Sequence, residues 1–238
     1  MLFDEIFRKQ SRNNDKSIWP ASEKWTTEIN KWLEFIKYKK ELERYLPRLK
    51  DSSARRDDAL SEIYSAYILE TKFNYKIIGW EEKGNNGKDI DLVIKDGNDK
   101  VYCEVKSPGW ESELNSNERK NGRSRLEKHA NGEVRGITPW RPIRYAVKKA
   151  YPKFLAGNKN VVIIKDDLFI EPDSGDFEMA LYEPKPLFDN ESGYFADAGY
   201  GVISGVLHLQ LKLVSGQGFE RTSNYYKNPF ALNMWAFN

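Results

Sequence analysis

The 238-residue chain has little of the chemistry on which cysteine- and histidine-based sites depend, with one Cys, two His and three Met. The single cysteine, Cys103, forms no internal disulfide and excludes a cysteine-rich zinc or iron–sulfur site. His129 and His208 lie far apart without the spacing of metal ligands, so we expect surface or core roles for them.

Long apolar runs are also missing. The first six residues include Asp4 and Glu5, where a signal peptide carries basic and then apolar residues. The most apolar late stretch, residues 201–214, contains Lys212 and is shorter than the roughly 20 residues that a membrane-spanning helix needs. At 13% aromatic residues, the chain is too hydrophobic for a disordered protein. We therefore expect a soluble, cytoplasmic protein with a sizeable core and no membrane partner.

The net charge of +2 hides a strong asymmetry along the chain. Residues 119–153 hold eleven Lys or Arg and two Asp or Glu, whereas residues 165–197 hold ten Asp or Glu and two Lys. This pattern is expected of a chain that meets phosphate on one surface, although a solvated loop is the alternative. The candidate nucleic-acid contacts are Arg119, Lys120, Arg123, Arg125, Lys128, Arg135, Arg141, Arg144, Lys148, Lys149 and Lys153.

The hydrophobic periodicity predicts an α/β domain with a mixed sheet. We expect a long amphipathic helix over 22–45, which ends before Pro47 and either packs on the main domain or serves as an interaction arm. A second helix follows over 58–72. Strands are predicted at 75–80, 90–95 and 100–106, a helix at 142–154, and strands at 160–164 and 202–213, before an irregular aromatic tail.

Two carboxylates of the helix over 58–72 fall within its apolar arc. At about 100° per residue, Glu62 and Glu70 lie on the buried side of this helix. Because an unpaired buried charge is costly, each must find a partner, for which a nearby Lys or Arg is the simplest choice.

The most informative residues lie on two neighbouring strands joined by a turn at residues 96–99. Side chains alternate along a strand, so Glu104 and Lys106 share one face, while Cys103 and Val105 face the core. Asp91, on the preceding strand, comes level with Glu104. Two carboxylates suit Mg²⁺, and a lysine beside them can orient an attacking water or stabilise developing negative charge. A surface hairpin with a Glu–Lys pair is the alternative interpretation. Residues 84–89 lack phosphate-loop spacing and predict a turn.

Asp91, followed after twelve residues by Glu104-Val105-Lys106, resembles the signature of the PD-(D/E)xK nuclease superfamily. The resemblance implies a restriction-endonuclease-like αβββαβ core over residues 58–165, with a basic loop at 107–139. Residues 1–57 would form an N-terminal helical extension, and residues 166–238 a β-containing C-terminal extension packed on the core. No Pro precedes Asp91, which leaves Asp89 as a rival.

Carried over by position, the resemblance implies a metal site formed by Asp91, Glu104 and the Val105 carbonyl, with Lys106 as the catalytic lysine. Glu62 is the best match to the family's additional helix carboxylate, and Glu70 is the second. The expected function is a DNA endonuclease of restriction or repair type that uses Mg²⁺, with Mn²⁺ as a substitute. Its expected partner is double-stranded DNA, and restriction-type cutting favours a homodimer. The alternatives are a non-catalytic nucleic-acid-binding protein with this fold and an interaction protein that recruits a partner through its N-terminal helix.

Overall fold

The protein is described by a computed structural model over residues 1–8, 23–51, 53–107, 140–165, 172–184, 192–214 and 216–237. Its centre is a six-stranded mixed sheet with spatial order β1-β2-β3-β4-β5-β6. The pairs β1–β2, β2–β3 and β5–β6 are antiparallel, and the pairs β3–β4 and β4–β5 are parallel. The strands are β1 Lys76–Lys83, β2 Asp89–Asp96, β3 Asp99–Lys106, β4 Lys159–Lys165, β5 Gly205–Val214 and β6 Gly218–Lys227.

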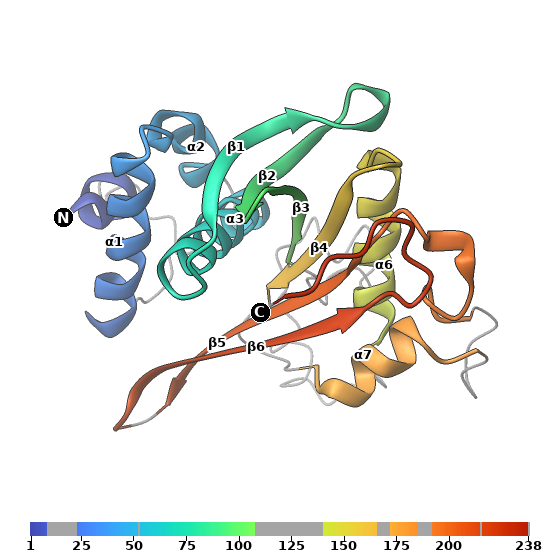
Figure 1. The fold of residues 1–238 in the computed structure, drawn as a ribbon. Helices are drawn as coiled ribbons and strands as arrows, with labels where there is room; N and C mark the ends of the chain where they lie inside the picture. The colour runs from blue at the N-terminus through green and yellow to red at the C-terminus, as the bar shows by residue number, and fades with distance from the viewer. Residues whose placement is uncertain are drawn as a thin grey trace, which may run out of the picture.

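Helices cover both faces of this sheet (Figure 1). One face packs against α1 (Glu23–Tyr38), α2 (Leu42–Leu49) and α3 (Ser53–Thr71), and the other against α6 (Trp140–Ala150) and α7 (Ser174–Leu181). The neighbouring β4 residues Val161 and Val162 belong to opposite core clusters and are both fully buried. Residues 161–164 are continuously apolar because β4 is covered on both sides. The predicted α/β class with a mixed sheet is confirmed.

The N-terminal helix differs from the prediction. It is interrupted after Tyr38, where Lys40 takes a left-handed backbone conformation with φ of 64°. A second helix, α2, follows and contains Pro47, which the sequence analysis placed beyond the helix end. The apolar side of α1, including Trp32, Leu33 and Ile36, is buried in the core. Helix α1 thus packs on the main domain, which is the first of the two roles predicted for it.

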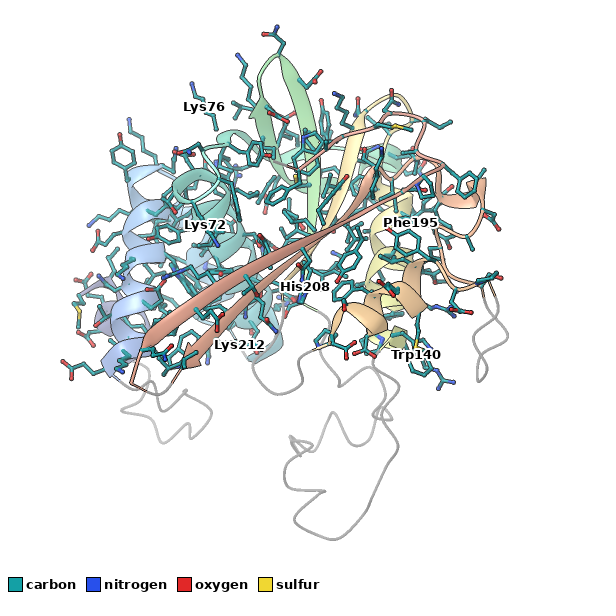
Figure 2. All side chains as sticks on the ribbon, turned by 60° about the horizontal axis from the view of Figure 1, so that its bottom comes forward. Lys72, Lys76, Trp140, Phe195, His208 and Lys212 are labelled. Atoms are coloured by element: carbon teal, nitrogen blue, oxygen red, sulfur yellow. The ribbon has the colours of Figure 1, made fainter. Side chains whose placement is uncertain are left out.

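Two elements of the C-terminal third were not predicted. The acidic segment contains α7, whose first turn is closed by a reciprocal capping box between Asp173 and Asp176. The tail expected to be irregular contains β6, which pairs with β5 along its whole length. Strands β5 and β6 therefore extend the central sheet. Figure 2 shows this hairpin crossing the molecule, with His208 near the middle of β5 and Lys212 nearer its tip.

Candidate active site

The β2–β3 hairpin brings the first two predicted site residues together. Leu92 pairs with Cys103, so in the same register Asp91 lies opposite Glu104. The Val105 backbone N–H donates a hydrogen bond of 2.8 Å to Asp91 Oδ2. The Asp91 side chain is 14% exposed, whereas the Glu104 side chain is fully buried. Two carboxylates thus share one end of the hairpin, and one of them is open to solvent.

Lys106 is bound to Glu104 of this pair. Its ammonium group donates to Glu104 Oε1 and, at 3.2 Å, to the Val105 carbonyl. Cys103 and Val105 belong to the core cluster on the side of α3, which is the alternation that the sequence predicts. The rival carboxylate, Asp89, instead forms an ion pair of 2.5 Å with exposed Lys83.

A second lysine reaches the same carboxylates from a distant part of the chain. Lys153 ends η5 (Tyr151–Lys153), a turn of 3₁₀ helix that directly follows α6. Its ammonium group contacts Glu104 Oε1 and lies 4.0 Å from Asp91 Oδ1. From the sequence, Lys153 is distinguished only as one of the basic residues of the 119–153 block. No local pattern singles it out, because its position depends on how η5 meets the hairpin.

The acceptor atoms at this site fit a divalent cation. Glu104 Oε2 is buried and accepts no hydrogen bond from any residue the structure describes. In the part of the chain that the structure describes, no group of three or more His, Cys, Asp or Glu side chains is arranged to hold a metal ion. The oxygen donors at this site that could hold a cation are Asp91, Glu104 and the Val105 carbonyl, the set that the resemblance implies. This small set of hard oxygen donors suits Mg²⁺, which keeps several waters and shares substrate phosphates.

Burial and charge oppose each other at these groups. Burial, helped by the Asp91 carboxylate, raises the pKa of Glu104, while the ammonium groups of Lys106 and Lys153 counteract this. For Lys106, burial lowers the pKa, but Glu104 and Asp91 outweigh it, so that the pKa is raised. Lys106 is consequently an ammonium ion at neutral pH and serves as a hydrogen-bond donor.

Glu62 lies on α3 at the edge of this cluster. It is 6% exposed and accepts two hydrogen bonds, of 2.7 and 2.5 Å, from the Arg48 guanidinium on α2. Burial raises the pKa of Glu62 to about 7, Arg48 opposes the rise, and the Asp91 carboxylate adds to it. Glu70 lies elsewhere, paired with Lys39 and accepting the Ile77 N–H at 3.3 Å. Each carboxylate in the apolar arc of α3 thus has the basic partner that the sequence analysis expected.

Apart from Lys153, which lies at the site, the predicted nucleic-acid contacts divide into three groups. Six of them, together with His129, lie outside the described residues: Arg119, Lys120, Arg123, Arg125, Lys128 and Arg135. Arg141, Lys148 and Lys149 are exposed on α6. Arg144 is 4% exposed, and its guanidinium donates to the carbonyls of Met179 at 3.2 Å and Ala180 at 3.4 Å. Arg144 therefore binds carbonyls at the C-terminal end of α7, and its buried guanidinium does not face solvent as a phosphate-binding residue would.

Comparison of the chain with protein-family models, curated proteins and solved structures finds no match. None of the described helices has both the length and the apolar character that crossing a membrane requires.

Proposed function

We propose that the protein is a Mg²⁺-dependent nuclease with a restriction-endonuclease-like core that hydrolyses phosphodiester bonds in double-stranded DNA. The observation that carries the proposal is the position of Asp91 level with Glu104, with Lys106 bound to Glu104. The helix, three strands, helix and strand from α3 to β4 follow the order expected for such a core. The site lies where β3 ends and the chain leaves the sheet.

Each residue has a role that its surroundings support. Asp91, Glu104 and the Val105 carbonyl would hold the cation, which supplies a hydroxide at neutral pH and neutralises phosphoryl charge when bound. Lys106, kept as an ammonium ion by its carboxylate neighbours, orients the attacking water or stabilises charge on the phosphoryl oxygens. Glu62 acts on the site through its charge and is held in place by Arg48.

Basic side chains beside the site support a polyanionic substrate. Lys148 and Lys149 occupy the last turn of α6, immediately before η5 and Lys153. Exposed Lys and Arg residues supply the phosphate contacts that dominate nucleic-acid affinity. Cutting of both strands at one position favours a symmetric homodimer, because each copy then supplies one site.

A cleavage assay tests the proposal. The purified chain is incubated with supercoiled plasmid, linear duplex, a four-way junction and single strands in Mg²⁺, Mn²⁺ or EDTA. We expect cleavage of a duplex substrate with either metal and none in EDTA. Absence of cleavage of all four substrates with both metals, at protein concentrations that bind DNA, contradicts the proposal.

A non-catalytic nucleic-acid-binding protein is the second candidate. It is favoured by one observation: two ammonium groups, of Lys106 and Lys153, already neutralise the Glu104 carboxylate without a metal ion. This candidate predicts salt-sensitive binding to duplex DNA with no nicking under either metal.

A further inference from the structure

Lys153 joins the two candidate metal ligands from outside their hairpin. Its ammonium group contacts Glu104 and lies 4.0 Å from Asp91 Oδ1. The Lys153 side chain is 24% exposed, whereas Glu104 is fully buried. The ammonium group therefore lies between a buried carboxylate and the solvent from which a phosphate group arrives.

The backbone at Lys153 is fixed by close packing. The next residue, Phe154, is buried in the core cluster around α6, and its N–H donates to the Tyr151 carbonyl at 3.2 Å. On the other side, a Cβ added at Gly84 would lie 2.3 Å from the Lys153 carbonyl oxygen and 2.9 Å from Ile90 Cγ1. Only glycine lets the turn before β2 approach η5 this closely. The base of the Lys153 side chain is thus held, while its four-carbon stem can rotate.

The two lysines at Glu104 differ in what else holds them. Lys106 also donates to the Val105 carbonyl of its own strand, so its ammonium group is anchored at two acceptors of β3. Among the described residues, the Lys153 ammonium group contacts only the two carboxylates, and it is held by attraction to them. A divalent cation and an ammonium ion are attracted by the same negative charge on Asp91 and Glu104, so binding of the cation weakens the hold on the ammonium group.

We propose that Lys153 is a phosphate-binding residue that Asp91 and Glu104 hold until they bind a divalent cation, and that then contacts the substrate phosphate. This inference rests on the proposed nuclease function. It assigns Lys153 a role distinct from that of Lys106, whose ammonium group is held by two acceptors of its own strand.

Metal binding and DNA binding, measured separately from cleavage, test this role. The full-length variants are Lys153→Met and Lys153→Gln, so that the test survives if one of them fails to fold. The control is Lys159→Met, which removes a lysine paired with Asp99 at the far end of β3. Mn²⁺ affinity is measured without DNA from the electron paramagnetic resonance signal of free Mn²⁺. Affinity for a duplex oligonucleotide is measured by fluorescence anisotropy in EDTA and in Ca²⁺.

Two results are expected. Both Lys153 variants bind Mn²⁺ about tenfold more tightly than the wild type, because one of the two ammonium groups that neutralise the carboxylates is removed. The increase in duplex affinity from EDTA to Ca²⁺ is about tenfold smaller in the same variants. They lack the Lys153 ammonium group that the bound cation frees to contact phosphate. Lys159→Met behaves like the wild type in both measurements.

The outcomes separate this inference from the proposed nuclease function. Unchanged Mn²⁺ affinity, or an unchanged gain in duplex affinity, in both folded Lys153 variants overturns the role of Lys153, even if the wild type cleaves DNA. If both expected effects appear but the wild type cleaves no substrate in Mg²⁺, the role of Lys153 in phosphate binding is supported and the nuclease function falls.

Discussion

The backbone N–H of Val105 donates a hydrogen bond to Asp91 Oδ2 across the β2–β3 hairpin. A backbone donor orients the Asp91 carboxylate whatever side chain occupies position 105. Its other oxygen, Oδ1, is directed toward Lys153, 4.0 Å away. This hydrogen bond fixes the partly buried Asp91 carboxylate beside buried Glu104.

Removing the charge of Asp91 is expected to abolish cleavage without unfolding the chain. Asp91→Asn keeps an oxygen that can accept the Val105 N–H but is a much weaker cation ligand, so we expect the cleavage rate to fall by on the order of 10³. Duplex affinity in EDTA should stay within about twofold of the wild type. The control is Asp99→Asn, at the other end of the same hairpin. A cleavage rate close to that of the wild type would remove Asp91 from the site.

Replacement of Lys106 should slow the chemical step more than it affects DNA binding. Lys106→Ala removes a donor aimed at the site, and we expect single-turnover cleavage to slow by about 10² to 10³. Lys100→Ala provides the control, because Lys100 is exposed on the same strand. Circular dichroism of the variant checks that burying Glu104 without this partner leaves the fold intact. Equal cleavage rates for the Lys106 and Lys100 variants would contradict the assignment.

The raised pKa of Glu62 predicts a pH-dependent contribution to stability. The carboxyl has a pKa of about 7 in the folded protein and an ordinary value of 4.5. The folded state then binds the proton more tightly, so the contribution is complete below pH 4.5 and is lost as the pH rises through 7. Relative to Glu62→Gln, the wild type should therefore lose about 1.4 kcal/mol per pH unit within this window.

Urea unfolding of both proteins at several pH values measures this difference. A gain in the stability of the wild type relative to Glu62→Gln with rising pH would contradict this prediction. It would mean that the two hydrogen bonds from Arg48 outweigh burial and keep Glu62 ionised.

A buried charge network joins the N-terminal helix to the last strand, and its loss should destabilise the fold. Glu28 on α1 is 1% exposed and accepts hydrogen bonds from Arg221 on β6 and from Trp32 Nε1. Glu28→Ala leaves these donors without their acceptor, which we expect to cost about 3 kcal/mol in urea unfolding. Glu34→Ala, at an exposed position of the same helix, should change stability by less than about 0.5 kcal/mol. Similar losses in the two variants would show that the network contributes nothing specific.

Local sequence signals predict the central strands well and the elements near the chain ends poorly. The hairpin of β2 and β3 was predictable because Asp96 and Asp99 flank a two-residue turn that contains Gly97, whose φ is 58°. The break at Lys40 was not, because the amphipathic pattern continues through it into α2. Strand β6 was missed because it is a polar edge strand, recognisable only by its pairing with β5.

The sequence by itself determined that Asp91, Glu104 and Lys106 meet, because alternation along two strands joined by a tight turn is a local property of the chain. Tertiary structure alone decided that Lys153 reaches the same carboxylates and that Arg48 binds Glu62. Those contacts depend on how α2, α3 and η5 pack against the hairpin. Such packing is set by the shape of the buried core, and the spacing of charged residues along the chain does not record it.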